Sequence, residues 1–300
     1  IVYLIQNGVS PANILAVTFT NKAAQEMRER VGALIKETGM PSAPLGVYEP
    51  PFIGTFHSLG VFMLRERGKD IDIKKNFSIK DTEGSIRLVR EAVQTLGVDK
   101  KQYIPSKISA IISKQKGELI TADEYREKAH THDFFNTVSK IWELYETLLK
   151  KENSLDFDDL ICKTILLLKT KMAARHYYQN KWQYVHIDEY QDTNHAQYIF
   201  SKLLSAKHKN ICVVGDSDQN IYSWRGAHIQ NMLRFEEEYP GTHVVFLEEN
   251  YRSTKIILDT ANEIIKKDLP VKMPFLGKGL LIVIGKTPNL NSSLANSIAL

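Results

Sequence analysis

The stretch Val185–Asn194, VHIDEYQDTN, joins an apolar run to the adjacent carboxylates of Asp188 and Glu189. The run predicts a short buried strand, and ligands bind outside the carboxyl ends of the strands in a parallel sheet. A carboxylate at that position can hold Mg²⁺, and a neighbouring acid can orient a water for phosphoryl transfer. Taken alone, the pair is more typical of a solvated strand end that is followed by an acidic helix cap.

Five short apolar runs rich in β-branched residues predict the strands of this sheet: Ile14–Phe19, Tyr184–Asp188, Ile211–Gly215, His243–Leu247 and Leu280–Ile284. Segments with helical periodicity separate several of them. Buried strands without alternating polarity, joined by helices, indicate a parallel sheet that is covered on both faces. The fold class predicted from this pattern is therefore α/β.

The pattern changes between Leu59 and about Trp182, where amphipathic helices follow one another and no clear buried strand is predicted. The apolar stripes expected on two of these helices are Ile86, Val89, Val93 and Leu96, and Ile141, Leu144, Tyr145 and Leu148. We expect this region to be a mostly helical insertion in the α/β domain.

The composition is that of a soluble globular protein, with 43% hydrophobic and 25% charged residues in a chain of 300. The two distant cysteines predict neither a disulfide framework nor a zinc site, which is typical of a reducing compartment. No apolar run approaches the roughly 18 residues of a membrane span. The net charge of +4 permits a nucleic-acid partner without indicating one. The chain starts at Ile1 inside a helical pattern and ends in a weakly patterned segment, so we expect both ends to be cuts.

A second polar segment follows a predicted strand in VVGDSDQNIYSWRGA, Val213–Ala227. Gln219 comes after the strand end, and Tyr222, Trp224 and Arg225 follow it. Aromatic faces stack nucleobases at roughly 1–3 kcal/mol each, and arginine adds phosphate contact or cation–π attraction. The alternative is that Trp224 fills the core and that GDSDQ is an ordinary turn.

Two further motifs place hydroxyl groups beside candidate ligand sites. TFTNK, Thr18–Lys22, follows a predicted strand and opens a helix, whose free N–H groups together with an amide and a cation favour an anion. GTFHS, Gly54–Ser58, offers hydroxyl groups and rings that can stack. The alternatives are a helix cap for the first motif and a satisfied loop for the second.

A fifth motif, LEENYRST at Leu247–Thr254, ends another apolar run. Tyr251 can stack on an adenine, and Arg252 can reach a γ-phosphate as an arginine finger does. The alternative is a surface arginine at the start of a helix.

In this order and spacing, TFTNKAA, GTFHS, DEYQDTN, VGDSDQNIYSWRGA and LEENYRST resemble the motifs of the UvrD/Rep/PcrA family of superfamily 1 DNA helicases. SLDFDDL, at Ser154–Leu160, is similar to a further segment of that family. The resemblance runs from about Ile14 to Lys267. It implies a RecA-like motor lobe of the P-loop NTPase type with a mostly helical inserted subdomain.

The resemblance also implies a division of the chain into domains. The first motor lobe is expected at residues 1–58 and 183–246, the helical insertion at 59–182, and the start of the second motor lobe at 247–300.

Each motif receives a role in ATP hydrolysis from the resemblance. Asp188 is expected to bind Mg²⁺, and Glu189 to act as the general base. Gln219 is expected to sense the γ-phosphate and to couple it to DNA. Tyr251 is expected to stack on adenine, and Arg252 to contact the γ-phosphate.

The resemblance further implies a track for single-stranded DNA, made of hydroxyl, aromatic and basic side chains. Its expected members are Thr18, Phe19, Asn21, Lys22, Thr55, Phe56, His57, Tyr222, Trp224 and Arg225.

The chain departs from the family pattern in its phosphate-binding loop, of the GxGKT type, which is absent before the first motif. Gly285-Lys286-Thr287 does not replace it, because Leu280 stands where the leading glycine is required. We therefore expect this chain by itself to bind ATP poorly and to be inactive.

The function implied by the resemblance is that of an ATP-dependent 3′–5′ DNA helicase or translocase in DNA repair or replication restart, with ATP and Mg²⁺ as cofactors. The expected partners are single-stranded DNA, its junction with duplex DNA, and repair or replication proteins, in the cytoplasm at the nucleoid. One alternative is a helicase–nuclease subunit of the RecB/AddA kind. Another is a non-catalytic DNA-binding scaffold with a degenerate motor, although a scaffold needs none of the four catalytic candidates.

Overall fold

The computed structural model describes residues 1–37, 49–128, 133–216, 219–220, 230–246, 253–268 and 281–284. The chain divides into two compact units. The first unit comprises Ile1–Thr55, Tyr177–Thr193 and Leu204–Leu300, and the second comprises Phe56–His176 and Asn194–Leu203.

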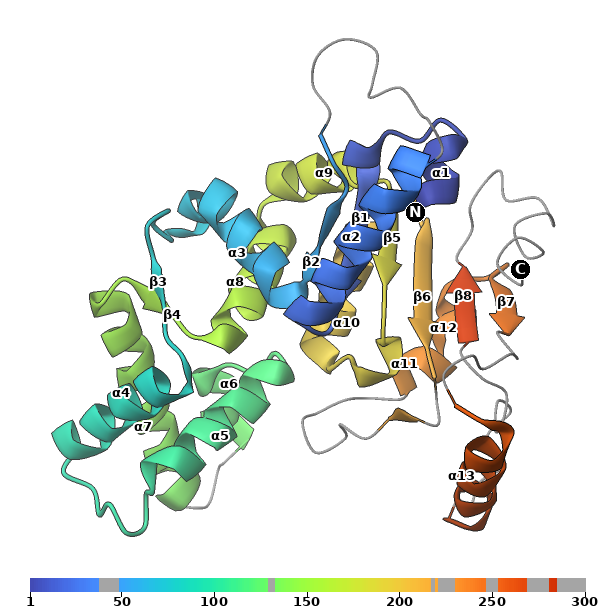
Figure 1. Cartoon of the computed structure of the whole chain (residues 1–300). Coiled ribbons are helices and arrows are strands. Elements are labelled where there is room, and N and C mark those ends of the chain that lie inside the picture. The colour runs from blue at the N-terminus through green and yellow to red at the C-terminus, as the bar shows by residue number, and fades with distance from the viewer. Residues whose placement is uncertain are drawn as a thin grey trace. The chain divides into compact units, whose positions relative to one another are not determined.

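A six-stranded sheet with the order β2-β1-β5-β6-β8-β7 forms the centre of the first unit (Figure 1). Its strands are β1 (Ile14–Thr18), β2 (Phe52–Thr55), β5 (Tyr184–Ile187), β6 (Ile211–Gly215), β7 (His243–Phe246) and β8 (Leu281–Ile284). The predicted α/β class and the five predicted strands are confirmed. Strand β2 was not predicted, because only four residues separate Pro51 from the following helix and one of them is glycine.

Strands β1, β2, β5 and β6 run parallel to one another, whereas β8 runs antiparallel to both of its neighbours, β6 and β7. The predicted parallel sheet is confirmed for these four strands, and β8 is an antiparallel exception of a kind that is common in mixed sheets of α/β folds. Because β8 pairs with β6, it lies in the same sheet as the first-lobe strands. The assignment of residues 247–300 to a second lobe stays a prediction.

The helices of the first unit are short or of medium length. They are α1 (Val2–Gln6), η1 (Pro11–Asn13), α2 (Asn21–Glu37), η3 (Tyr190–Asp192), α11 (Gln230–Leu233), α12 (Phe235–Glu238) and α13 (Lys255–Asp268). Residues of both units make up α9 (Met172–Lys181) and α10 (His195–Ser205). Strand β1 is buried along its whole length. Trp182 is also fully buried and stacks on Tyr178 with ring centroids 5.3 Å apart. This apolar burial is the main force that holds the sheet together.

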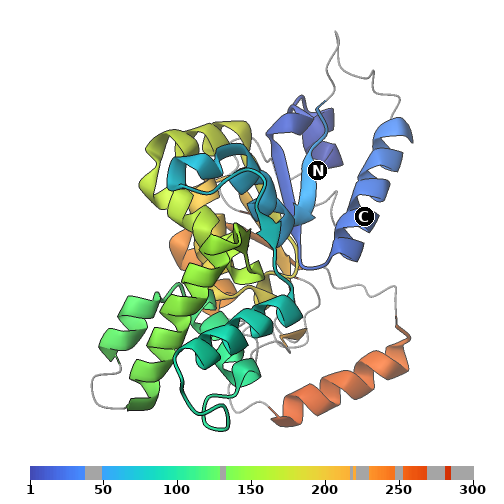
Figure 2. The same cartoon turned by 90° about the vertical axis from the view of Figure 1, so that its left-hand side faces the viewer.

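The second unit is mostly helical. Its helices are α3 (Phe56–Arg67), η2 (Gly68–Ile71), α4 (Thr82–Thr95), α5 (Pro105–Gly117), α6 (Ala122–Lys128), α7 (Asp133–Lys151) and α8 (Phe157–Thr170). Figure 2 shows α4 to α7 grouped together, coloured from teal to green. No clear buried strand was predicted in this region. The structure has two short strands there, the exposed β3 (Ser78–Ile79) and the buried β4 (Ser154–Leu155), which pair in parallel. Strands of two residues are too short to show a periodic pattern in the sequence.

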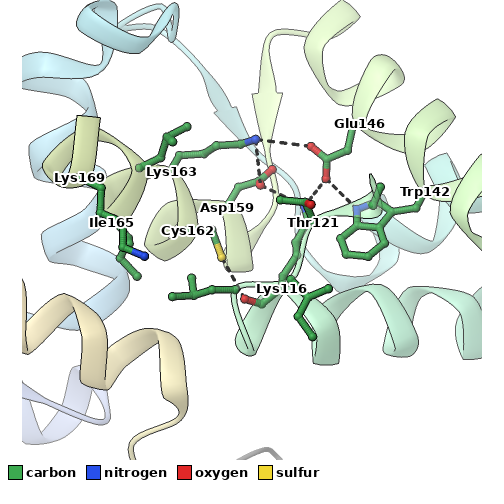
Figure 3. Close-up of a pocket in the computed structure, with 13 residues that line it drawn as sticks. Lys116, Thr121, Trp142, Glu146, Asp159, Cys162, Lys163, Ile165 and Lys169 are labelled. Carbon is green, nitrogen blue, oxygen red and sulfur yellow. Dashed lines mark hydrogen bonds and ion pairs between the residues drawn. The ribbon is translucent and has the colours of Figure 1, made fainter. Parts of the chain in front are cut away.

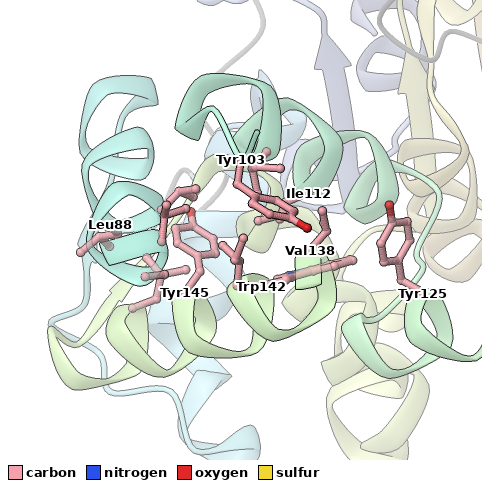
Figure 4. Packing of buried hydrophobic residues seen from close by; sticks show 13 residues of the cluster. Leu88, Tyr103, Ile112, Tyr125, Val138, Trp142 and Tyr145 are labelled. Atoms are coloured by element: carbon pink, nitrogen blue, oxygen red, sulfur yellow. The ribbon is translucent and has the colours of Figure 1, made fainter. Parts of the chain in front are cut away.

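The core of the helical unit lies where α4, α5, α6 and α7 meet (Figure 4). Its buried side chains include the predicted Val89, Val93, Ile141 and Tyr145. Trp142 is 2% exposed and belongs to the same core, although the predicted stripe omitted it.

Candidate functional site

The carboxyl ends of the parallel strands bring four sequence motifs to one edge of the sheet. Thr18 and Thr55 are partners in register at the ends of β1 and β2. Asp188 follows β5, and its backbone N–H donates to the carbonyl of Val17, with N and O 2.9 Å apart. Asp216 follows β6. This edge is where α/β sheets bind ligands.

Asp188 and Glu189 form a pair of adjacent carboxylates at this edge. Burial raises the pKa of Asp188, and the negative charge of Glu189 raises it further. Glu189 has a φ of 51°, in the left-handed region that non-glycine residues rarely adopt. Backbone strain of this kind costs roughly 1–3 kcal/mol and is found mainly at functional sites.

A third carboxylate, that of Asp192, lies on η3 and is 8% exposed. Its Oδ1 atom is buried and has no hydrogen-bond partner among the described residues. Burial, followed by the charge of Glu189, raises the pKa of Asp192 to about 6. Within the described part of the chain, no cation forms an ion pair with Asp188, Glu189 or Asp192.

The acidic side chains at this edge, without a cation partner in the described part of the chain, fit the ligand set of a Mg²⁺ ion. No group of three or more His, Cys, Asp or Glu among the described residues is arranged as an all-protein metal site. Mg²⁺ usually takes only one or two carboxylates and completes its shell with waters and substrate phosphates. Asp188 would hold the ion, which would relieve the repulsion between neighbouring carboxylates.

The segment after β6 is tied to the segment after β5 by side-chain amides. Gln219 Nε2 donates to Asp216 Oδ2 at 2.6 Å. Gln191 Nε2 donates to Glu189 Oε2 at 2.7 Å, and Gln191 Oε1 accepts from the backbone N–H of Asp216 at 3.1 Å. The structure thus connects two of the predicted catalytic residues, Glu189 and Gln219, through residues that the sequence analysis did not single out.

The TFTNK motif forms the end of β1 and the first turn of α2. Thr18 is buried, and its hydroxyl donates to the carbonyl of Thr20 at 3.0 Å. The Thr20 hydroxyl accepts from the N–H of Ala23 at 3.1 Å, which caps the helix. Lys22 is 87% exposed and lies 3.9 Å from Glu26. The cap suggested as the alternative is therefore present, and the exposed cation remains available to a phosphate.

The GTFHS motif spans the end of β2 and the start of α3. Phe56 is 4% exposed and packs against Phe200, with ring centroids 6.2 Å apart. Burial lowers the pKa of His57, whose ring meets Phe157 edge-on at 5.7 Å. The ring of Phe56 therefore has no free face for a base in this conformation.

Tyr222, Trp224, Arg225, Tyr251 and Arg252 lie outside the described residues, as does Gly285-Lys286-Thr287. Their predicted roles stay predictions.

A second cluster of charged side chains lies in the helical unit, beside a cavity of about 440 Å³ (Figure 3). Lys116 Nζ lies 2.6 Å from Glu146, 2.7 Å from Asp156 and 3.0 Å from Asp159. Burial alone would lower the pKa of Lys116, but the three carboxylates raise it well above its ordinary value.

This cluster explains the SLDFDDL segment. Asp156 caps α8 by accepting from the N–H of Asp159 at 2.7 Å, and it accepts a further hydrogen bond from Tyr145 at 2.8 Å. Because each of these carboxylates has a partner, the cluster is a structural lock that joins α5, α7 and α8.

Comparison with known proteins decides the family. The model of the UvrD/REP helicase N-terminal domain matches residues 1–240. The chain belongs to the UvrD/Rep helicase family. The ATP-dependent DNA helicase PcrA of Staphylococcus aureus is 46% identical over 270 residues, which are 89% of this chain and 36% of that helicase. PcrA of Staphylococcus epidermidis is 46% identical over 268 residues, covering 89% of this chain and 35% of the relative.

The UvrD/Rep-family chain thus spans about a third of the length of these curated relatives. Among its described residues, no helix has the length and apolar character needed to cross a membrane.

Sequence reasoning identified the motifs of the family but missed Gln191, Asp216 and Asn220 as members of the site. The sequence carries one signal that could have identified Gln191 as a site residue: only Tyr190 separates it from the acidic pair.

Proposed function

We propose that this chain supplies the catalytic carboxylates of an ATP-dependent DNA helicase that moves 3′ to 5′ along single-stranded DNA. The observation that carries the proposal is the placement of Asp188 and Glu189 at the carboxyl edge of the sheet. Gln191 joins the carboxylate of Glu189 by hydrogen bonds to the segment that contains Gln219. Family membership supports it, since the named relatives are ATP-dependent DNA helicases.

In the proposed mechanism, Asp188 would hold a Mg²⁺ ion, which would neutralise charge on the phosphates of ATP. Glu189 takes a proton from the attacking water. Gln219 senses the γ-phosphate, while Tyr251 stacks on the adenine and Arg252 contacts the γ-phosphate. Glu189 suits the role of base because its carboxylate is fixed by a hydrogen bond at 2.7 Å and by an uncommon backbone conformation.

The proposed track for DNA begins at the edge that carries Thr18 and Thr55. Lys22 supports it, since its exposed cation stands at the start of α2, where free N–H groups favour phosphate. Tyr222, Trp224 and Arg225 are proposed to stack and hold the bases. The proposed partners are single-stranded DNA, its junction with the duplex, and proteins of repair or replication restart, at the nucleoid in the cytoplasm.

The experiment that tests the proposal is Glu189→Gln in the full-length protein that contains this sequence. A positioned general base contributes roughly 10²–10⁴-fold to a rate. We expect DNA-stimulated ATP hydrolysis to fall by about that factor while the affinity for single-stranded DNA is kept. Unchanged turnover would remove Glu189 from the role of base, and a parallel loss of DNA binding would indicate damage to the fold.

A further inference from the structure

Gln191 is an almost fully buried side chain between the two catalytic segments, with 1% of its surface exposed. Its amide makes one hydrogen bond to each side. The Nε2 group donates to Glu189 Oε2 at 2.7 Å, and Oε1 accepts from the N–H of Asp216 at 3.1 Å. A neutral amide suits this position, because its N–H end can donate to a carboxylate while its oxygen accepts from a backbone N–H.

The surroundings hold this amide in one orientation. Asn220 Nδ2 donates to the backbone carbonyl of Gln191 at 2.7 Å. Gly215 leaves the space that the amide occupies, because a Cβ atom there would lie 2.5 Å from Gln191 Oε1. Asn231 Nδ2 donates to the carbonyl of Thr193 at 3.1 Å and fixes the end of the same turn.

A continuous path of hydrogen bonds therefore runs through the site. It starts at the carboxylate of Glu189, crosses Gln191 to Asp216, and reaches Gln219, which donates to Asp216 Oδ2 at 2.6 Å. A displacement of the segment after β6 would move the Asp216 N–H that donates to Gln191 Oε1, and so change the direction in which the Glu189 carboxylate points.

We propose that Gln191 is a positioning residue that aligns the Glu189 carboxylate according to the state of the segment after β6. This inference rests on the proposed function, because Glu189 must be the base for its alignment to matter. A misplacement of about 1 Å at a catalytic group can lower a rate by roughly 10²-fold.

The test uses the full-length protein that contains this sequence, with saturating single-stranded DNA. Gln191→Met keeps the length of the side chain and removes both hydrogen bonds. Gln191→Glu keeps the acceptor for the Asp216 N–H but faces Glu189 with a like charge. We expect both variants to lower kcat for ATP hydrolysis by roughly 10- to 100-fold and to change the KM for ATP by less than about threefold.

The substitution Gly215→Ala, at the end of β6, perturbs the same amide of Gln191 from the other side of the contact. The new methyl group would displace the end of the flexible Gln191 side chain, so we expect the same loss of kcat without a change at position 191. Gln179→Met, which removes another buried glutamine amide of the first unit, is the matched control. We expect it to change the melting temperature and to leave kcat of the folded protein unchanged.

The outcomes separate the two proposals. A wild-type protein without DNA-stimulated ATP hydrolysis would overturn the proposed function. An active wild type, with Gln191→Glu and Gly215→Ala at wild-type kcat, would overturn only the positioning role. A fall in kcat that follows the loss of folded protein, and that Gln179→Met reproduces, would also overturn it, because a purely structural amide behaves in that way.

Discussion

At the scale of the residue, Gly60 permits the closest approach between two helices of the helical unit. A Cβ atom at Gly60 of α3 would lie 2.3 Å from the carbonyl oxygen of Leu160 in α8. This neighbour is backbone and cannot turn aside. Gly60→Ala should therefore lower the free energy of unfolding by about 1–3 kcal/mol, as overpacked cores do.

The matched control is Gly32→Ala in α2, where a Cβ atom meets nothing within 4 Å. Because alanine has a higher helix propensity than glycine, the free energy of unfolding of this variant should rise by up to about 1 kcal/mol. Urea denaturation of both variants measures the difference. Equal effects of the two substitutions would contradict the close contact between α3 and α8.

Sequence reasoning at this scale found the residues whose chemistry is visible in their type. Asp188 and Glu189 stood out as adjacent acids after an apolar run. Gln191 did not, because its importance depends on two partners, one of which belongs to a segment 25 residues further on. The burial of Phe56 was likewise hidden, since the helix that carries Phe200 begins far away in sequence.

At the scale of the element, Lys116 joins three helices through three carboxylates. Lys116→Met would leave Asp156 and Asp159 buried without the cation nearest to them. Breaking a buried ion pair from one side costs about 3–5 kcal/mol. We expect the free energy of unfolding of the chain to fall by that amount in urea denaturation.

Lys163→Met is the control for this cluster, because Lys163 is 34% exposed and lies 3.7 Å from Glu146 and 3.9 Å from Asp159. Partly exposed pairs contribute under about 1 kcal/mol. If Lys116→Met were no more harmful than Lys163→Met, the buried cluster would not be the lock between α5, α7 and α8.

The N-terminus of α8 also predicts a dependence on pH. Burial, followed by the charge of Asp156, raises the pKa of Asp158 from 3.8 to about 6. The folded state then binds more protons than the unfolded state between these values, so the contribution of Asp158 to stability falls as the pH rises from 3.8 to about 6. Asp158→Asn should therefore raise the melting temperature more at pH 7.5 than at pH 5.

The control for this prediction is Glu91→Gln, an exposed carboxylate of α4. This variant removes an exposed negative charge of the same unit, so the comparison separates the buried position from the general effect of losing one charge. If Asp158→Asn raised the melting temperature less at pH 7.5 than at pH 5, the result would contradict a raised pKa of Asp158.

The sequence predicted the extents of β1, β5, β6, β7 and β8 closely, whereas it did not predict the buried faces of the helices. Leu96 was expected in the core but is 38% exposed, and Leu88 and Ala92 are buried instead. Helix α7 packs against both α4 and α6, so its buried face is wider than the single predicted stripe and includes Trp142 and Leu149. A periodic pattern gives the direction of a helix face but not how many neighbours cover it.

At the scale of the whole molecule, one edge of a single sheet carries both kinds of proposed residue: Asp188 and Glu189 for ATP hydrolysis, and Thr18 and Thr55 for DNA contact. The sequence motifs predicted this convergence, because parallel strands end on the same side. The direction of β8 was not predictable from its composition, since an apolar run is equally compatible with parallel and antiparallel pairing. The family, rather than the residues alone, supplies the expectation of directional movement.

The most direct test is strand separation by the full-length protein that contains this sequence, with Mg²⁺ and ATP. Two partial duplexes are compared that differ only in whether the single-stranded tail ends in 3′ or 5′. We predict ATP-dependent unwinding of the 3′-tailed duplex, with little unwinding of the 5′-tailed one, and loss of this unwinding in Glu189→Gln. Unwinding of the 5′-tailed duplex alone, or equal activity in Glu189→Gln, would contradict the proposed function.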